Sequence, residues 1–226
     1  MIIPQRLNTE TARDYAYRAI RDNIISIDLE PGAIVSESEL AQKLGVSRTP
    51  VREALIELSK INFVIILPQR GSMISKIDYR IIEESRFIRL SIEKEIVQEA
   101  CQHATPEDIS KMEDILYMQK KYINHSDSDR FMELDNEFHR LLYTTARKEF
   151  VYKIIKDTGV HFDRVRRLGF SDSNLDRIVT DHEAIVEAIK MKDKEMAKRL
   201  VTKHLTRYKV DEEKIRKKYA KYLVED

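Results

Sequence analysis

Four side chains in the second half of the chain combine the donor types of a divalent-metal site. Asp135 and His139, in FMELDNEFHRLL, are four residues apart, so both point from one face of a helix. His182 opens the apolar-striped segment HEAIVEAIKM, and His204 lies in phase with the apolar residues of RLVTKHLTRY. Three neutral imidazoles and one carboxylate are ligands that zinc, nickel and manganese accept. The pattern predicts a metal site inside a helical bundle.

The spacing leaves other interpretations open. Core histidines that satisfy a single hydrogen bond are the ordinary alternative to metal ligands. A metal centre of this composition can also activate water for hydrolysis, but that reaction needs a well-placed base. Glu183 is rotated about 100° from His182 on the helix, which disfavours a hydrolase. The remaining histidines of interest, His103, His125 and His161, lie beside polar or loop residues and are expected to be structural or solvated.

A second group of residues, near the N-terminus, has the chemistry of DNA recognition. In SESELAQKLGVSRTPVREALIEL, Ser36 and Glu39 have the spacing of a capping box that starts a short helix. Gly45 permits the left-handed backbone that turns the chain sharply out of this helix. Ser47 then begins a second helix, in whose first turn Pro50 is tolerated because first-turn amides lack intrahelical partners. The segment predicts a helix-turn-helix.

The exposed face of the second predicted helix carries Arg48, Thr49 and Arg52. The arginine fork matches the acceptors of guanine or a phosphate when the helix enters the major groove. A basic hairpin follows, with Arg70 at its tip, where it can reach the neighbouring minor groove. Each arginine alone is most simply a solvated surface charge. Their clustering on two consecutive recognition elements favours a winged helix that binds double-stranded operator DNA.

The elements that carry these groups are mainly helical, and the predicted fold is mainly α. A helix over 9–28, with Thr9 as its N-cap, precedes the helix-turn-helix, and strands over 63–67 and 72–77 form the hairpin wing. Beyond residue 77 helical periodicity prevails, with short polar breaks. We expect an all-helical bundle with six helices over 78–103, 105–125, 127–145, 147–169, 174–191 and 193–222.

Composition sets the wider frame. The 226 residues suit one small and one medium domain, which we place at 1–77 and 78–226. The net charge of +1 gives no bulk basic field, so DNA binding must depend on local arginines. No apolar run is long enough to span a membrane, and no signal peptide is recognisable. The single cysteine, Cys101, cannot form an internal disulfide, and we expect a cytoplasmic protein.

The N-terminal stretch LEPGAIVSESELAQKLGVSRTPVREAL, followed by QRG, resembles the GntR family of winged-helix regulators. Ser38 stands where many members carry arginine, and Asn62 replaces the usual glycine before the wing strand, although asparagine tolerates a left-handed backbone. The DNA-contacting positions that this resemblance implies are Ser38, Ser47, Arg48, Thr49, Arg52, Arg70 and Gly71.

The later stretches RFIRLSIEKEIVQEA, LDNEFHRLLY, DHEAIVEAI and KDKEMAKRLVTKHL look like the FCD-type effector domain, over most of residues 80–208. The resemblance implies a metal held by Asp135, His139, His182 and His204. It also implies that Arg89 faces the effector and pairs with a carboxylate; the alternative is an i,i+4 ion pair with Glu93. Lys148 departs from the usual asparagine, which puts a local helix-capping contact in doubt.

These expectations combine into one mechanism. A small carboxylate effector binds the metal and Arg89, and shifts the population of domain orientations in a homodimer. The two recognition helices must then reach half-sites about 34 Å apart. The alternative that keeps DNA binding makes the metal purely structural.

Overall fold

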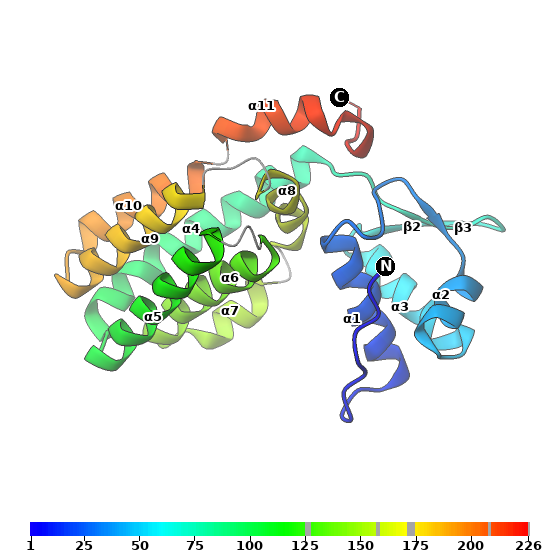
Figure 1. Cartoon of the computed structure of the whole chain (residues 1–226), viewed down its shortest axis with the longest axis horizontal. Coiled ribbons are helices and arrows are strands. Elements are labelled where there is room, and N and C mark those ends of the chain that lie inside the picture. The colour runs from blue at the N-terminus through cyan, green and yellow to red at the C-terminus, as the bar shows by residue number, and fades with distance from the viewer. Residues whose placement is uncertain (125–127, 157–158, 171–174, 208, 226) are drawn as a thin grey trace. The chain divides into compact units, whose positions relative to one another are not determined.

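The computed structural model describes residues 1–124, 128–156, 159–170, 175–207 and 209–225, and its elements are labelled in Figure 1. The N-terminal elements form a winged helix. Helix α3 packs against both α1 and α2, and a small antiparallel sheet has the strand order β1-β3-β2. The elements are α1 (Ala12–Ile25), β1 (Ile34–Val35), α2 (Glu37–Leu44), α3 (Arg48–Lys60), β2 (Val64–Leu67) and β3 (Gly71–Ile74).

The turn between α2 and α3 has the local chemistry that its sequence predicts. The Ser36 hydroxyl accepts the backbone N–H of Glu39 at 3.1 Å, which caps α2. Gly45 ends α2 with a φ of 65°, in the left-handed region. Ser47 is the N-cap of α3, although its side chain makes no capping hydrogen bond. The expected cap of α1 was wrong by two residues, since the hydroxyl that accepts the Asp14 N–H belongs to Thr11.

The wing contains one strand more than expected. Strands β2 and β3 pair from Val64 opposite Ile74 to Leu67 opposite Gly71, and β1 pairs with the free edge of β3. Asn62, before β2, has a φ of 59°, so the left-handed turn survives the replacement of glycine. The three strands hold the tip of the wing, around Arg70, at the end of a hydrogen-bonded ribbon.

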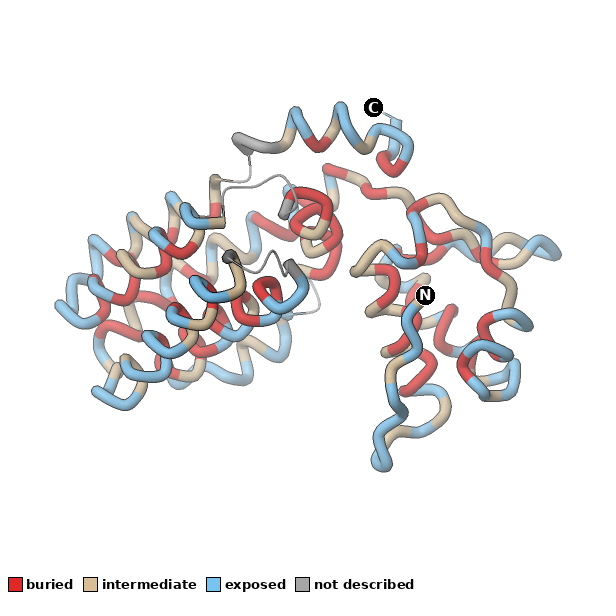
Figure 2. The backbone as a smooth tube through the Cα atoms, viewed as in Figure 1, coloured by how far each residue is buried: buried red, intermediate tan, exposed pale blue. Residues whose placement is uncertain are grey.

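The described regular elements of the second half of the chain are helices joined by short connections. Helix α5 packs against α6 and α9, and α9 also packs against α10. Their shared core includes Phe138, Leu142, Ile185 and Val201, and the buried sides of these helices face one another in Figure 2. The helices are α4 (Tyr79–His103), α5 (Pro106–Asn124), α6 (Ser128–Thr145), α7 (Glu149–Ile155), α8 (Val160–Phe170), α9 (Leu175–Lys190), α10 (Lys194–Thr206) and α11 (Lys209–Lys218), followed by a 3₁₀ turn over Ala220–Tyr222.

Two of the six expected helices are each divided in two. The helix expected over 147–169 becomes α7 and α8, with Gly159 directly before α8, and glycine costs about 1 kcal/mol in a helix interior. The helix expected over 193–222 ends first at Thr206, and α11 begins at Lys209. Lys148 begins α7 without a side-chain capping bond, as its departure from asparagine predicts.

The chain forms two compact units. The first contains Met1–Tyr79, Asp163–Val165 and Tyr219–Asp226, and the second contains Arg80–Phe162 and Arg166–Lys218. Within the first unit the Ile77 N–H donates to the carbonyl of Tyr222 at 2.9 Å, so the C-terminal segment belongs with the winged helix. Among the described residues, no helix is both long and apolar enough to cross a membrane.

Candidate metal centre and nucleic-acid interface

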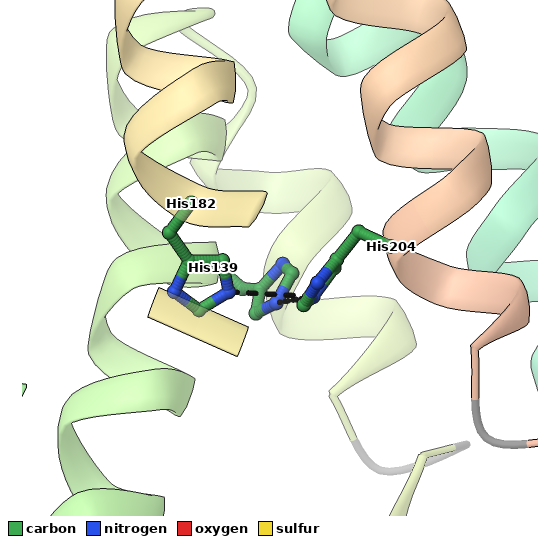
Figure 3. A group of neighbouring side chains, drawn as sticks. All are labelled: His139, His182 and His204. Carbon is green, nitrogen blue, oxygen red and sulfur yellow. Dashed lines mark hydrogen bonds between the residues drawn. The ribbon is translucent and has the colours of Figure 1, made fainter. Parts of the chain in front are cut away.

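Three imidazoles from three helices of the bundle point toward one another. His139 lies on α6, His182 on α9 and His204 on α10 (Figure 3). The Nε2 atom of His204 is 3.3 Å from the Nε2 of His182 and 3.3 Å from the Nε2 of His139. His139 and His182 are buried, and His204 is nearly so. The fold therefore brings together three residues that are up to 65 positions apart in the chain.

Two of these rings are fixed from behind by polar groups. His139 Nδ1 lies 2.8 Å from Glu93 Oε2, and a carboxylate can only accept, so His139 Nδ1 carries the proton. His182 Nδ1 lies 3.1 Å from the amide oxygen of Gln119 and donates in the same way. With Nδ1–H engaged, each neutral ring turns the lone pair of Nε2 toward the centre of the cluster.

His204 completes the cluster but has no such support. Its Nδ1 has no hydrogen-bond partner among the described residues, and Asp181 Oδ2 is 3.7 Å away, beyond hydrogen-bond distance. Its Nε2–H can be shared between two acceptor nitrogens but cannot fully satisfy both. A cation at the centre would accept all three Nε2 lone pairs and leave the Nδ1–H of His204 directed toward Asp181.

The donor set fits a divalent metal ion. The ring nitrogens lie within 4.8 Å of one another, with one ligand atom available from each histidine. Nitrogens bound to zinc at ~2.0–2.1 Å and tetrahedral angles are ~3.3–3.4 Å apart, which agrees with the two Nε2–Nε2 distances of 3.3 Å. The arrangement is compatible with metal binding, and zinc, nickel and manganese all accept imidazole.

Asp135, the fourth predicted ligand, borders the cluster. Its Oδ1 is 3.6 Å from His182 Nε2 and its Oδ2 is 3.9 Å from His139 Nε2. Oδ2 accepts a hydrogen bond from Arg166, whose other terminal nitrogen donates to Asn136 at 2.8 Å. Both carboxylate oxygens thus border the imidazoles, and Oδ2 is also held by a guanidinium. The sequence does not indicate the contribution of Arg166.

Arg89 is linked to the histidine cluster through Glu93. Its Nε donates to Glu93 Oε1 at 2.7 Å, and the other oxygen of Glu93 accepts from His139. The i,i+4 pair that the sequence offers as the alternative is therefore formed. A direct role for Arg89 in holding an effector stays a prediction.

Burial and neighbouring charges set the protonation of the cluster. Burial alone would raise the pKa of the Glu93 carboxyl, but Arg89 and His139 hold it below its usual value. The pKa of Asp135 is likewise lowered, against the effect of burial, by Arg166 and the histidines. Burial lowers the pKa of His139, and it lowers that of His182 well below the usual value, with a further contribution from His204. Ionised carboxylates and neutral imidazoles are the forms that bind a cation.

The predicted DNA-contacting residues lie on the first unit. Arg48 and Arg52, on the first two turns of α3, are 68% and 71% exposed and approach Glu37 loosely, at 3.5 and 4.0 Å. Exposed pairs of this length are worth little, so both guanidiniums are available to another partner. Ser38, Ser47, Thr49 and Arg70 are also exposed, and Gly71 is half-buried. Arg70 lies in the turn that joins β2 to β3.

Position 71 requires glycine for a structural reason that is separate from DNA contact. Its φ is 97°, and a Cβ placed there would lie 2.7 Å from the backbone oxygen of Val35. Only glycine permits β1 to approach β3 so closely at this point.

The groups around the cluster come from outside the sequence motifs. Gln119 lies on the same buried face of α5 as Met112 and Leu116. A polar residue in this otherwise apolar stripe is the feature of the sequence from which its role could have been predicted. Arg166 and Asp181 carried no comparable signal. Among the other histidines, His103 lies 3.8 Å from Glu99, His161 is buried in α8, and His125 lies outside the described residues.

Family models match both halves of the chain. Residues 12–74 match the model described as bacterial regulatory proteins, gntR family, and residues 84–207 match the FCD domain. The first match contains the helix-turn-helix and wing. The second contains Asp135 and the three histidines.

Relatives match over most or all of the chain. The HTH-type transcriptional repressor RspR of Escherichia coli K12 is 31% identical over 228 residues, covering 100% of both chains. The gluconate operon transcriptional repressor of Bacillus licheniformis is 28% identical, covering 78% of this chain and 75% of its own. The solved structure of E. coli McbR/YncC has the same fold, with a TM-score of 0.78 at 20% identity, covering 93% of this chain and 100% of its own. The chain therefore belongs to the GntR family of bacterial regulatory proteins, in the group with an FCD domain, and is a DNA-binding transcription regulator and not an enzyme.

Proposed function

We propose that the chain is a ligand-responsive repressor whose bundle binds a divalent metal ion. Asp135, His139, His182 and His204 are the ligands in this proposal. The observation that carries it is the convergence of three Nε2 atoms with two separations of 3.3 Å, the spacing of nitrogens around a tetrahedral metal. The polar groups behind His139 and His182 support it, because they select the tautomer that ligates.

The signal in this proposal is a small carboxylate. A metal held tetrahedrally by these four side chains would have to expand to five or six ligands to take up an effector, and carboxylate oxygens suit the added positions. A metal bound by these residues would supply a Lewis-acidic centre for the acid. Arg89, if it exchanges Glu93 for the effector, would supply a planar fork for the same carboxylate or a second one.

The output is binding to operator DNA. Ser38, Ser47, Arg48, Thr49, Arg52, Arg70 and Gly71 are the proposed contacts, with α3 in the major groove and Arg70 in the adjacent minor groove. A homodimer would present two such surfaces to half-sites about 34 Å apart, in the cytoplasm. Repression is proposed because RspR and the gluconate operon regulator are both named repressors.

The alternative hypothesis of a metal-dependent hydrolase is disfavoured. Glu183, the carboxylate next to His182, forms an ion pair with Lys120 and is 42% exposed. Membership of a family of regulators also gives the winged helix a purpose that a hydrolase would not.

Elemental analysis of the purified full-length protein tests the metal site. We expect about one zinc, nickel or manganese per chain, lost in the His139→Gln and His204→Gln variants and kept in a His103→Gln control.

A thermal-shift screen of small organic acids, run on loaded and stripped protein, then tests the effector. An acid that stabilises only the loaded form supports coordination. Absence of metal from protein that also fails to bind added metal would overturn the proposal. Operator binding that no acid alters, together with unfolding of the bundle on metal removal, would make the metal structural.

A further inference from the structure

One of the three rings in the histidine cluster lacks an acceptor for its Nδ1 atom. His139 donates its Nδ1–H to Glu93. His182 donates to Gln119 in the same way, so both rings direct an Nε2 lone pair at the centre of the cluster. The Nε2 of His204 lies 3.3 Å from each of these nitrogens, and its Nδ1 makes no hydrogen bond. His204 is therefore the ring whose proton must reside on Nδ1 before all three Nε2 atoms can serve as ligands.

Asp181 faces this unpartnered nitrogen from the neighbouring helix. It lies on α9, directly before His182, and its Oδ2 is 3.7 Å from the Nδ1 of His204. Only 5% of Asp181 is exposed, so water does not readily take its place. An ionised carboxylate is purely an acceptor, and this one would satisfy an Nδ1–H once the gap closes by about 1 Å.

Arg207 holds Asp181 next to this ring. Its Nε donates to Oδ2 and its Nη2 to Oδ1, both at 2.7 Å. A carboxylate oxygen can accept two hydrogen bonds, so Oδ2 keeps one site open. Lys203 also approaches Asp181, at 3.8 Å, but its side chain is 67% exposed and solvent screens its charge. The backbone N–H of Arg207 donates to the carbonyl of His204 at 3.3 Å, so the arginine that fixes Asp181 is itself tied to the residue that Asp181 faces.

We infer that Asp181 is the positioning residue of His204, and that Arg207 holds it in that role. The inference rests on the proposed function and deepens it, because it names the acceptor that the third ligand lacks. Once all three Nε2 lone pairs serve as ligands, the proton of His204 resides on Nδ1, and a buried N–H without an acceptor is costly. The ring releases its Nε2 proton to solvent and takes one up at Nδ1, so it stays neutral. His139 and His182 are thus preset as ligands, whereas His204 is set on binding by Asp181.

The zinc affinity of matched variants tests the role of Asp181. Full-length protein is titrated with zinc at pH 7.5 in competition with a chromophoric chelator. Asp181→Ala should bind zinc about 10–100-fold more weakly, the loss expected for an outer partner of a metal ligand. Asp181→Asn keeps an oxygen that can accept from Nδ1–H and should recover most of the affinity. Glu183→Ala is the control, because Glu183 is the other neighbour of His182 and pairs instead with Lys120.

The Nδ1 proton of His204 gives a second readout, which a general loss of packing would not produce. Protein labelled with 15N-histidine is observed by long-range proton–nitrogen correlation, which distinguishes Nδ1–H from Nε2–H. In zinc-loaded protein we expect His204 to carry its proton on Nδ1 and to exchange it slowly with water. In Asp181→Ala saturated with zinc, this proton should exchange at least ten-fold faster, while the Nδ1–H of His139 should not change.

The outcomes separate this inference from the proposed function. If zinc does not bind, both fail together. If zinc binds but Asp181→Ala has the affinity of Glu183→Ala, or if its His204 proton exchanges no faster, the inference alone fails. Asp181→Asn that binds no better than Asp181→Ala would also refute the role of acceptor. Should Asp181→Ala not fold, Arg207→Gln decides, since several-fold changes in affinity and exchange support the inference and unchanged values overturn it.

Discussion

The three histidines depend on residues that do not belong to the ligand set. An imidazole has two nitrogens, and it ligates through Nε2 only when the proton resides on Nδ1. Glu93 and Gln119 fix that choice for His139 and His182 by accepting from Nδ1–H. At the scale of single residues, the metal affinity of the site therefore depends on the acceptors of each Nδ1–H as well as on the imidazoles themselves.

Replacement of Gln119 by leucine should weaken metal binding. The change keeps a side chain of similar size but removes the oxygen that accepts from His182 Nδ1–H, so the ring can move its proton to Nε2. Loss of such an outer partner costs about 10–100-fold in affinity. Zinc affinity, measured by competition with a chromophoric chelator, should fall in Gln119→Leu. It should stay unchanged in Gln98→Leu, whose amide donates to the Lys94 carbonyl on α4 at 2.8 Å. Equal affinities in the two variants would contradict the tautomer argument.

Stability of the stripped protein should fall as the pH drops through about 6.5. Burial lowers the folded-state pKa of His139 and His182, so below about 6.5 the unfolded chain binds more protons than the folded one. The free energy of unfolding then decreases toward acid. The lowered pKa values of Glu93 and Asp135 add to this loss only below about 4.5, outside the window.

Thermal denaturation in chelator between pH 7.5 and 5.5 measures this effect. The midpoint should fall less steeply in His182→Gln than in the unmodified protein, while His103→Gln should follow the unmodified protein. Three parallel curves would mean that the buried histidines do not control acid stability.

The residue types of the site were predictable from sequence, but their support was not. The helical phase of Asp135 and His139, and the inward phase of His182 and His204, made these side chains candidates, and the resemblance to the FCD-type domain combined them into one set. Gln119 is 63 positions from His182, and Arg166 is 31 from Asp135. Such pairings depend on how the helices pack, and no local periodicity contains that information.

At the scale of elements, α3 and the wing provide the surface for DNA. Helix α3 buries Val51, Ala54, Leu55 and Leu58 and leaves Arg48 and Arg52 exposed near its N-terminus. The opposite end of the same helix carries Lys60, also exposed and 2.8 Å from Glu57. The helix thus offers a test in which charge is removed from either end without disturbing its packed face.

Arg48→Ala and Arg52→Ala should each weaken operator binding by roughly ten-fold or more while the fold is retained, because a bidentate arginine contact is worth about 1–3 kcal/mol. Lys60→Ala should change affinity little. Fluorescence anisotropy with labelled operator DNA, together with circular dichroism, measures both properties. Affinity like that of the unmodified protein in both arginine variants would refute the recognition-helix assignment.

Gly71→Ala should destabilise the winged helix more than Gly45→Ala. Both glycines have positive φ, so alanine is strained at either position. At Gly71 the added Cβ would also lie 2.7 Å from the Val35 oxygen, whereas at Gly45 nothing lies within 4 Å. We expect a loss of about 1–2 kcal/mol in Gly45→Ala and a larger loss in Gly71→Ala, by urea denaturation. Similar losses would show that β1 moves away at no cost.

Element prediction found the helices of the bundle but missed a short strand and two interruptions. Helix α4 begins one residue after its predicted start and ends where predicted, because more than six helical turns repeat the same pattern. Strand β1 has two residues, too few for any alternation to be recognised, and it forms only because β3 offers it an edge. The divisions of 147–169 and 193–222 fall within strongly periodic segments, where the helical pattern alone does not show an interruption.

At the scale of the whole molecule, the chain separates its two tasks between two compact units. The first contains the winged helix with the C-terminal segment, and the second contains all four proposed metal ligands. A ligand stabilises only the state that binds it, by RT ln(1 + [L]/Kd), which is about 2.7 kcal/mol at a hundred times Kd. The bound metal should therefore act on the unfolding of one unit first.

Calorimetric unfolding in zinc and in chelator tests this separation. We expect two transitions in chelator, with zinc raising the midpoint of the bundle transition by several degrees and leaving that of the winged helix nearly unchanged. Gly71→Ala identifies the winged-helix transition, since it lowers that midpoint alone, and His139→Gln should abolish the zinc effect. Operator DNA should raise the other midpoint. If zinc instead raises both midpoints equally, or if only one transition occurs, the separation is contradicted. In either case the two units would unfold as one cooperative body, and the metal would stabilise the winged helix together with the bundle.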